Sequence, residues 1–512
     1  MPDQTAHLLP ITPEELRARA GIVCVALAGA DLLRIAKETA RRYRFVEFRL
    51  DSLPDPSACL PDLANFLASH PQVTAIATCR RHAFGGAFQG TAEEQFEILI
   101  GAAKAGCELV DAEVETAEEL GPDMLNVVRD AGAAAMLSWH DFSGTPDLLP
   151  VYDRLSAFQP DFVKIVPTAK TLTDSLRLLD LLEASGGTGR LVAMSMSFHG
   201  VLTRVLGPRY GSAFTFAAPD GNEGTAPGQV SAATLCELYR IEQISRGTAL
   251  YAVAGSPIGA SLSPLMHNTA FRAAGMDAVY LPLETADPQE LQMVMQRLNI
   301  RGLSITMPLK ETVLPLLNTR EAAVTSMAAC NTLLRQDDGT LSGFNTDVAG
   351  IVGPLEQRLS LKGKRVLILG AGGAARAAAF GLRERGAEVF LLNRTAARAE
   401  ALAAESGAQV QPRGTLAATH FDILINSTPY GMRGKQIDSP ISPDEMKCDL
   451  FFDLVYNPLE TPLMLIAKEA DIETIAGAAM FVAQGVRQYE LWMGGKAPQA
   501  EMLQVVEDAL RA

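Results

Sequence analysis

The chain lacks the features that mark a disulfide-stabilised, zinc-binding or membrane-spanning protein. Its seven cysteines are odd in number and scattered, with no CxxC pair, which argues against a disulfide framework and a tetrahedral zinc site. No apolar run is long enough to span a bilayer. The start, MPDQTAHLLP, has neither the pattern of a secretory leader nor the composition of a transit peptide. We therefore expect a metal-free protein of the cytoplasm, a reducing compartment.

A positive charge balance is also missing. The 59 acidic and 44 basic residues leave a net charge of −15, which argues against a nucleic-acid partner. A small anionic substrate stays possible, because a few local arginines can hold one inside an acidic envelope. The 48% of hydrophobic residues are typical of a globular chain, and 512 residues suggest about three domains. The oligomeric state stays open.

Eight short apolar segments recur through the first half, each followed by a longer stretch with helical spacing. The expected strands are 22–27, 45–50, 73–78, 108–114, 134–139, 161–166, 190–196 and 213–216. Such alternation indicates a parallel sheet, and eight units in about 230 residues favour a closed (β/α)8 barrel. An open doubly wound sheet has the same content, and periodicity alone leaves both architectures possible.

The organisation changes near residue 245, where a helix expected around 231–245 ends and a new strand begins. Strand–helix alternation continues to about 350, and a further α/β unit then opens at LKGKRVLILGAGG. The tail, about 478–510, has helical spacing and is expected to pack back onto the second unit. We expect domains over 1–246, 247–350 and 351–477, with 478–512 returning to the second.

A glycine-rich turn opens the third unit. Between a buried-type strand at 365–369 and an alanine-rich helix, the turn has the G-x-G-x-x-[G/A] pattern of a Rossmann dinucleotide site. The next strand ends in N-R-T, where an NAD site usually has an acidic residue, so Arg394, helped by Arg398, favours NADP(H). The residues expected to hold this cofactor are Gly370, Ala371, Gly372, Gly373, Ala374, Asn393, Arg394, Thr395 and Arg398.

Several polar residues outside this turn form a second set. Taken singly, each has an ordinary interpretation as a helix cap, a turn residue or a surface charge. Together, the motifs S-L-S-P, S-I-T-M-P-L-K, C-N-T, N-T-D, N-R-T and D-L-V-Y-N-P, with M-F-V-A-Q-G, follow one another over about 250–512.

That succession resembles shikimate dehydrogenase. The resemblance implies that Lys310 and Asp347 form the catalytic pair, an ammonium that stabilises charge on the carbonyl oxygen and a carboxylate that orients it. It also implies substrate contacts from Ser261, Ser263, Thr306, Asn331, Asp347, Tyr456 and Gln484.

In the first half, Lys164 stands in the middle of an apolar strand. A lysine buried there would lose its charge easily and become a nucleophile toward carbonyls, whereas one near the strand end would reach solvent. Further polar residues are expected at the same mouth of the barrel, at strand ends or in the following loops. They are Glu47, Arg49, Arg80, His140, Arg204 in the loop after strand seven, and Gln229 in the loop 226–229.

This half resembles type I 3-dehydroquinate dehydratase over about 20–245, through E-F-R, T-C-R, S-W-H-D-F, the strand lysine, G-V-L-T-R and A-P-G-Q. The resemblance implies a Schiff base between Lys164 and the C3 ketone, with His140 moving the C2 proton to the departing C1 hydroxyl. It also implies that Arg204 holds the substrate carboxylate. The ring would be positioned by Glu47, Arg49, Arg80 and Gln229.

One position departs from that family. Phe84 stands where the family carries the glutamate that partners the histidine, and we hypothesise that His82 or Glu47 takes over its role. The two resemblances together imply a bifunctional chain in which the product of the barrel is the substrate of the dehydrogenase. Two alternatives stay open: a silent structural or sensing barrel, and an oxidoreductase that acts on quinate or shikimate in the catabolic direction.

Overall fold

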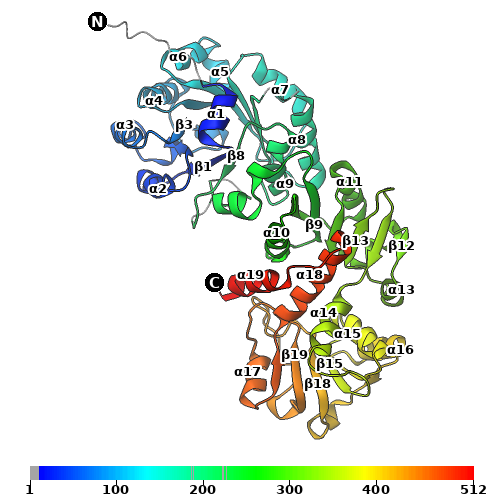
Figure 1. The fold of residues 1–512 in the computed structure, drawn as a ribbon. Helices are drawn as coiled ribbons and strands as arrows, with labels where there is room; N and C mark the ends of the chain where they lie inside the picture. The colour runs from blue at the N-terminus through cyan, green and yellow to red at the C-terminus, as the bar shows by residue number, and fades with distance from the viewer. Residues whose placement is uncertain (1–10, 186, 188, 222–223, 226–227, 512) are drawn as a thin grey trace. The chain divides into compact units, whose positions relative to one another are not determined.

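The structure, a computed structural model, describes residues 11–185, 187, 189–221, 224–225 and 228–511 (Figure 1). The chain divides into two compact units, one formed chiefly by residues up to 248 and the other chiefly by residues from 249 onward.

The first unit contains an eight-stranded parallel sheet in the order β7-β6-β5-β4-β3-β2-β1-β8. Its strands are β1 Val23–Leu27, β2 Phe45–Arg49, β3 Thr74–Thr78, β4 Leu109–Glu113, β5 Ala134–His140, β6 Phe162–Val166, β7 Leu191–Ala193 and β8 Thr215–Ala217. All eight expected strands are present, and β1 pairs with β8 as well as with β2. The predicted (β/α)8 barrel is therefore confirmed over an open sheet.

The barrel is completed between β7 and β8 by a few hydrogen bonds around Ser212. The Ala213 amide donates to the Leu191 carbonyl at 2.8 Å. The Ser212 hydroxyl accepts from the Ala193 amide at 3.1 Å and donates to the Phe214 carbonyl at 2.9 Å. A side chain thus joins two strands that are too short for a full ladder.

Helices follow the strands as the spacing predicts. They are α1 Pro13–Ala20, α2 Leu32–Thr39, α3 Leu60–Ser69, α4 Ala92–Lys104, α5 Val114–Leu120, α6 Met124–Asp130, α7 Leu148–Ser156, α8 Leu172–Ala184 and α9 Val201–Tyr210, with short turns η1 Leu50–Ser52 and η2 His82–Phe84. Helix α4 begins at a capping box in which Thr91 and Glu94 satisfy each other's free amides.

The predicted helix at 231–245 is wrong as a single element. The chain forms a π-type segment, η3 (Thr234–Leu238), and then a 3-10 turn, η4 (Ile241–Gln243). The Tyr239 amide donates to the Thr234 carbonyl at 3.1 Å, one residue beyond α-helical spacing, and Arg240 follows with a left-handed φ of 51°. Apolar spacing alone does not show such a break.

Alternation along the barrel strands produces two layers. Phe45, Ile76, Leu109, Met136 and Phe162 face inward and form an apolar floor, to which Leu16 of α1 adds. Two residues further along the same strands, and therefore on the same face, the sequence is polar. This second layer contains Glu47, Thr78, Asp111, Ser138 and Lys164, all buried.

The second unit contains two six-stranded sheets. The first has the order β10-β9-β11-β13-β14-β12, with β9 and β11 parallel, and β13 antiparallel to both β11 and β14. Its strands are β9 Ala249–Gly255, β10 Ala278–Glu284, β11 Gly302–Ile305, β12 Thr319–Arg320, β13 Thr332–Arg335 and β14 Leu341–Phe344. Its helical segments are α10 Ser263–Ala273, α11 Pro288–Leu298, α12 Leu309–Thr312, η5 Leu314–Leu316 and α13 Ala322–Met327.

The other sheet has the order β17-β16-β15-β18-β19-β20, and all its paired strands are parallel. The strands are β15 Arg365–Leu369, β16 Glu388–Leu392, β17 Gln409–Val410, β18 Phe421–Asn426, β19 Cys448–Asp453 and β20 Glu473–Ile475. The helical segments are α14 Asp347–Glu356, α15 Gly373–Glu384, α16 Ala396–Ser406, η6 Arg413–Ala418, η7 Pro443–Glu445 and α17 Pro462–Glu469. This is the doubly wound Rossmann order, whose ligand crevice lies where the order reverses, between β15 and β18.

The last two helices return along the second unit. Helix α18 (Gly477–Met493) packs against α14, and α19 (Gln499–Arg511) packs against α10 (Figure 1). Helix α10 belongs to the segment 247–350, onto which the tail is expected to pack.

Candidate active sites

The barrel has a pocket at the carboxyl ends of its strands, with a volume of about 60 Å³. It is lined in part by Met194, Met196, Phe142, Phe216 and Thr225. All seven site residues expected in this half also line it: Glu47, Arg49, Arg80, His140, Lys164, Arg204 and Gln229. Residues 226 and 227 of the A-P-G-Q motif lie outside the described residues.

Lys164 is buried in the middle of β6, with 4% of its surface exposed, and does not reach bulk water. Its Nζ lies 2.8 Å from Asp111 Oδ2 and 3.4 Å from Glu47 Oε1. The ammonium also lies 3.9 Å from the centroid of the Phe216 ring, a cation–π distance. Of the two interpretations of this lysine, the structure supports the buried one.

Asp111 on β4 is a polar residue that the sequence reasoning missed. Its Oδ2 accepts from both Lys164 Nζ and, at 3.3 Å, an Arg80 guanidinium nitrogen. Burial by itself would raise the pKa of Asp111, but the Lys164 and Arg80 cations hold it below its usual range. The signal was an aspartate inside the apolar run ELVDAEV, on the inward face of the strand.

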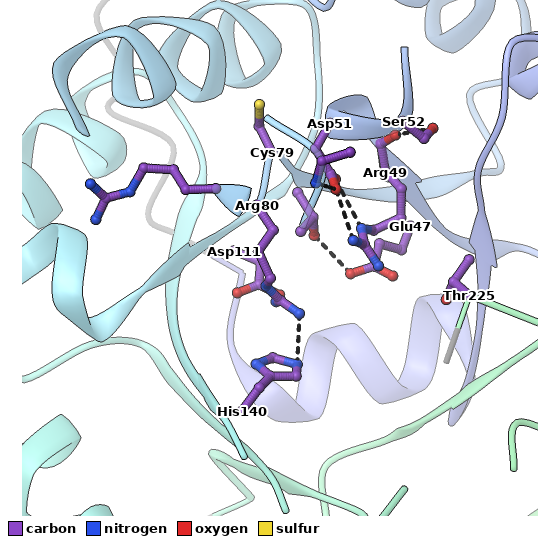
Figure 2. A network of polar contacts seen from close by, with 12 residues as sticks. Glu47, Arg49, Asp51, Ser52, Cys79, Arg80, Asp111, His140 and Thr225 are labelled. Carbon is purple, nitrogen blue, oxygen red and sulfur yellow. Dashed lines mark hydrogen bonds and ion pairs between the residues drawn. The ribbon is translucent and has the colours of Figure 1, made fainter. Parts of the chain in front are cut away.

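His140, at the end of β5, is paired with an arginine. Arg80 donates to His140 Nε2 at 2.8 Å (Figure 2). The second terminal nitrogen of Arg80 donates to Ser138 Oγ at 3.3 Å. Burial, and then the Arg80 and Lys164 cations, place the pKa of His140 well below 6.5. An acceptor nitrogen beside a guanidinium belongs to a neutral imidazole, the form that acts as a base.

The hypothesis that Glu47 or His82 orients His140 does not match the contacts. Glu47 accepts from Thr78 Oγ1 at 2.7 Å and contacts Lys164, and His82 lies exposed. Phe84 lies with its ring 4.9 Å from the Arg81 guanidinium carbon. The histidine is therefore held by Arg80, a partner of the opposite kind from the family's glutamate.

Arg204 lies in the first turns of α9, not in the loop after strand seven as expected, because that loop ends at Gly200 and the helix starts at Val201. It is 1% exposed, and within the described residues one terminal nitrogen donates to the Phe216 carbonyl at 3.1 Å. Among the described residues, none offers a hydrogen-bond partner to its buried Nε. Burial lowers the pKa of Arg204 to about 10, so the described residues compensate this cation poorly.

Two other predicted residues have local partners. Arg49 forms a bidentate pair with Asp51, at 3.0 and 2.9 Å (Figure 2). The side-chain oxygen of Gln229 accepts from the Thr225 amide at 2.7 Å and from its hydroxyl at 3.1 Å.

In the second unit, a cavity of about 920 Å³ extends from the ends of β9 and β11 to the turn after β15. It brings together twelve of the residues expected there. These are Ser261, Ser263, Thr306, Lys310, Asn331, Asp347, Ala371, Gly372, Gly373, Ala374, Tyr456 and Gln484.

Lys310, Asp347 and Asn331 form the polar centre of this cavity. Lys310 Nζ on α12 lies 2.5 Å from Asp347 Oδ2 at the start of α14. The other carboxylate oxygen accepts from Asn331 Nδ2 at 2.8 Å. The Asn331 amide thus positions the Asp347 carboxylate, which in turn positions the Lys310 ammonium in the cavity.

Sequence reasoning missed a polar chain at the wall of the cavity. Tyr280 donates to Ser304 Oγ at 2.5 Å, and Ser304 donates to Gln488 Oε1 at 2.7 Å. Gln488 in turn donates to Thr332 Oγ1 at 3.2 Å. Gln488 stands one helical turn beyond Gln484, which is the sequence signal that was available.

Two predicted residues close another wall. The ring of Tyr456 stacks on Phe481 at 4.7 Å, and burial raises the pKa of its hydroxyl. Gln484 on α18 donates to the Phe481 carbonyl at 2.9 Å.

The turn after β15 has the shape that a dinucleotide needs. Gly370 has a φ of 113°, and a Cβ there would come within 2.5 Å of Ser427 Oγ. At Gly372 and Gly373 a Cβ would meet no heavy atom within 4 Å, so backbone and cavity are in open contact there. Helix α15 begins at Gly373 and presents its free amides to this space.

The remaining cofactor residues lie beside this turn but do not line the cavity. Leu369 and Leu392 are register partners, so the N-R-T segment follows β16 next to Gly370. Asn393 Nδ2 donates to the Thr395 carbonyl at 2.9 Å, and Arg394 and Arg398 are exposed.

Among the described residues, no cluster of three or more His, Cys, Asp or Glu side chains could hold a metal ion. Within the same part of the chain, none of the helices has the length and apolar character to cross a membrane.

The fold and the two sites define a chain of two enzyme units, an α/β barrel with a buried lysine and a two-sheet unit with a dinucleotide turn. Family models match each unit: Type I 3-dehydroquinase over residues 23–246, the Shikimate dehydrogenase substrate binding domain over 253–333, Shikimate / quinate 5-dehydrogenase over 355–454 and the Shikimate 5'-dehydrogenase C-terminal domain over 477–507.

Relatives match the whole chain and its second unit. The chloroplastic bifunctional 3-dehydroquinate dehydratase/shikimate dehydrogenase of Arabidopsis thaliana is 30% identical over 511 residues, covering 95% of this chain and 84% of the relative. Shikimate dehydrogenase (NADP(+)) of Methanothermobacter thermautotrophicus is 39% identical, covering 52% of this chain and 98% of the relative. A solved structure of dehydroquinate dehydratase and shikimate dehydrogenase from S. pombe is 25% identical, covers 95% of this chain and 98% of its own, and gives a TM-score of 0.46. The chain belongs to the bifunctional 3-dehydroquinate dehydratase/shikimate dehydrogenase family.

Proposed function

We propose that the chain catalyses two consecutive reactions of aromatic biosynthesis. The barrel dehydrates 3-dehydroquinate to 3-dehydroshikimate, and the second unit reduces that product to shikimate with NADPH. The observation that carries the proposal is the assembly of the two site sets. Each unit has one cavity in which an amine lies beside a carboxylate, Lys164 beside Asp111 and Lys310 beside Asp347.

In the barrel, Lys164 condenses with the C3 ketone of the substrate to form a protonated Schiff base. The iminium acidifies the C2 position, and neutral His140 removes a proton there and delivers it to the C1 hydroxyl as water leaves. Arg204 binds the substrate carboxylate, which supplies a counter-charge that the described residues do not give this buried cation.

The other pocket residues position the ring. Glu47, Arg49, Arg80 and Gln229 line the same cavity, so their hydrogen bonds fix where C2 and C3 lie relative to the base and the amine.

In the second unit, Lys310 donates a proton to the carbonyl oxygen as that oxygen gains negative charge. Asp347 holds the ammonium in place, and Asn331 fixes the carboxylate. Ser261, Ser263, Thr306, Tyr456 and Gln484 bind the hydroxyl and carboxylate groups of the substrate.

The residues at the turn after β15 fit NADP(H). The open backbone at Gly372 and Gly373 and the start of α15 would hold its pyrophosphate, and Arg394 with Arg398 would hold the 2′-phosphate beside Asn393 and Thr395. When bound, NADPH supplies the hydride. The name of the Methanothermobacter relative supports this choice of cofactor.

The test is an assay of the whole chain with 3-dehydroquinate and NADPH. Lys164→Ala is expected to abolish enone formation while reduction of added 3-dehydroshikimate continues. Lys310→Ala is expected to give the opposite result, with 3-dehydroshikimate accumulating. A parent chain that reduces 3-dehydroshikimate but leaves 3-dehydroquinate untouched would contradict the barrel assignment.

That contradictory outcome is the silent-barrel alternative, which the structure does not favour. Burying a lysine, a neutral histidine and a poorly compensated arginine in one pocket costs folding free energy, which a purely structural module would not require.

The proposal extends to location, partners and boundaries. The free state of all seven cysteines supports a cytoplasmic location, and the net charge of −15 supports small molecules rather than nucleic acid as partners. The spans of the family models support barrel, substrate-binding and cofactor domains at 1–246, 247–350 with 478–512, and 351–477. Cell fractionation tests the location.

A further inference from the structure

A buried histidine that the mechanism above does not use lies behind the wall of the reductase cavity. His267 on α10 is 0% exposed. Its ring stacks on Tyr280 with the centroids 4.5 Å apart, and the Trp492 ring lies at 5.1 Å. Burial lowers the pKa of His267 to about 3, so the imidazole is neutral at physiological pH. A neutral imidazole has one N–H donor and one lone pair, and the position of the hydrogen decides what the ring can hold.

The two ring nitrogens of His267 have different surroundings. Nε2 lies 3.3 Å from Gln488 Oε1, whereas no described residue offers a hydrogen-bond partner to the buried Nδ1. A buried N–H donor is left without a partner more rarely than a buried acceptor. We therefore assign the hydrogen to Nε2, which donates to Gln488, and the lone pair to Nδ1.

A chain of hydrogen bonds leads from Gln488 to the catalytic pair, and its direction is fixed at the far end. A carboxylate only accepts, so Asn331 Nδ2 donates to Asp347 at 2.8 Å. The amide oxygen of Asn331 accepts from Thr332 Oγ1, also at 2.8 Å. Because Thr332 has given its hydrogen to Asn331, it accepts from Gln488 Nε2 at 3.2 Å. The other end of the Gln488 amide, Oε1, must therefore point toward His267.

Gln488 Oε1 has a second partner, which does not fix the amide by itself. Ser304 Oγ lies at 2.7 Å and in turn accepts from the Tyr280 hydroxyl at 2.5 Å. Hydroxyl groups rotate and can either donate or accept, so these two side chains fit a Gln488 amide turned either way. The Nε2–H of His267 only donates. It is therefore the contact that selects one orientation of the amide.

We propose that His267 is a positioning residue of the reductase. Its Nε2–H holds the Gln488 amide in one orientation. That orientation is the one that the chain through Thr332 and Asn331 needs in order to hold the Asp347 carboxylate. This inference rests on the proposed function of the second unit. His267 itself is not among the described residues that line the cavity, whereas Gln488 is, so the histidine acts through the glutamine.

The test is the steady-state reduction of 3-dehydroshikimate by the full chain, with kcat and KM measured separately. His267→Leu keeps a side chain of similar volume but removes the donor. We expect kcat to fall about tenfold, because a small displacement of a catalytic group is enough for such a loss. The KM for NADPH and the dehydratase activity should stay at the parent values. The matched control is His420→Leu, which replaces an exposed histidine paired with Asp449 and should keep the parent kcat.

Two conservative variants separate the hydrogen bond from packing. The side-chain nitrogen of glutamine can replace Nε2, whereas that of asparagine corresponds to Nδ1 and is too short to reach Gln488. His267→Gln is therefore expected to retain most of the parent kcat, and His267→Asn to lose as much as His267→Leu. Combined with Gln488→Leu, His267→Leu should cause no further loss of kcat, because both changes break the same chain.

Each outcome decides for or against His267. A parent-like kcat in His267→Leu overturns the inference, and so does equal activity of His267→Gln and His267→Asn. Losses that multiply in the double variant also overturn it, because His267 would then act independently of Gln488. If His267→Leu does not fold, the comparison of His267→Gln with His267→Asn decides. A parent chain that does not reduce 3-dehydroshikimate refutes the proposed function of the second unit instead.

Discussion

Replacing Arg204 by methionine is expected to make the barrel more stable and the dehydratase much weaker. Arg204 is 1% exposed, its Nε has no hydrogen-bond partner in the part of the chain that the structure describes, and burial lowers its pKa from an ordinary 12.5 to about 10. At about 1.4 kcal/mol for each pKa unit, holding this side chain charged costs the folded protein about 3 kcal/mol at neutral pH. Losing the bond to the Phe216 carbonyl offsets about 1 kcal/mol of that gain.

The net change is therefore a stabilisation of about 2 kcal/mol, which for a domain of this size raises the melting temperature by about 4–8 °C. Methionine suits the site because it is unbranched, flexible and apolar. Calorimetry of the full chain measures the barrel transition. The matched control is Arg177→Met, an arginine with 58% of its side chain exposed and paired with Asp174, which should change the melting temperature little.

Function should change in the opposite direction. A buried charge pair with the substrate carboxylate is typically worth 2 kcal/mol or more, so kcat/KM for 3-dehydroquinate should fall at least about 30-fold. The reductase activity of the same chain with 3-dehydroshikimate should stay constant and serves as an internal control. A variant that melts no higher than the parent and keeps its kcat/KM would refute the assignment of Arg204 as the cation that binds the substrate carboxylate.

Three further predictions concern the other groups. Because the pKa of His140 lies below 6.5, kcat/KM of the dehydratase should stay constant as the pH falls through 6.5. Arg80→Met should raise the pKa of His140 and move the acidic limb of the pH–rate profile to higher pH. An acidic limb that does not move would show that Arg80 does not lower the pKa of His140. Arg394→Ala should lower kcat/KM for NADPH by about tenfold and leave that for NADH unchanged, as expected for a lost phosphate contact; equal losses with both cofactors would place Arg394 outside the 2′-phosphate site. Asn331→Ala should lower kcat of the reductase by about tenfold or more, because the Asp347 carboxylate and its ion pair with Lys310 would be less well positioned. A steady-state comparison of shikimate with quinate in the same series would show which of the two substrates the cavity prefers.

Regular alternation explains why the barrel was predictable from the sequence. Each strand has the period of two that places Phe45 with Glu47 and Phe162 with Lys164 on the same face, so a polar residue two positions beyond an apolar one could be assigned to the pocket. The glycine turn was predictable for a similar reason, because Gly370 occupies a conformation and a close approach that other residues do not tolerate.

The rest depended on contacts between distant segments. Asp111 lies on a strand that carries no other recognised site residue, and only the closed barrel brings it to Lys164. Arg204 was expected in a loop because sequence does not fix where α9 begins. The break at Arg240 depends on a left-handed conformation inside an apolar pattern that reads as helix.

The charges of the two sites suggest that each would bind the substrate carboxylate in a different way. In the barrel, the cations Arg49, Arg80, Lys164 and Arg204 face the carboxylates of Glu47, Asp51 and Asp111, and His140 is neutral. Within this set of described residues one positive charge is left over, which would be the complement of one substrate carboxylate. In the second unit, Lys310 and Asp347 form an ion pair, and the proposed substrate contacts at Ser261, Ser263 and Gln484 are hydroxyl and amide groups. Because an ion pair is screened by salt more than a set of neutral hydrogen bonds, the dehydratase KM should rise with ionic strength more steeply than the reductase KM for 3-dehydroshikimate.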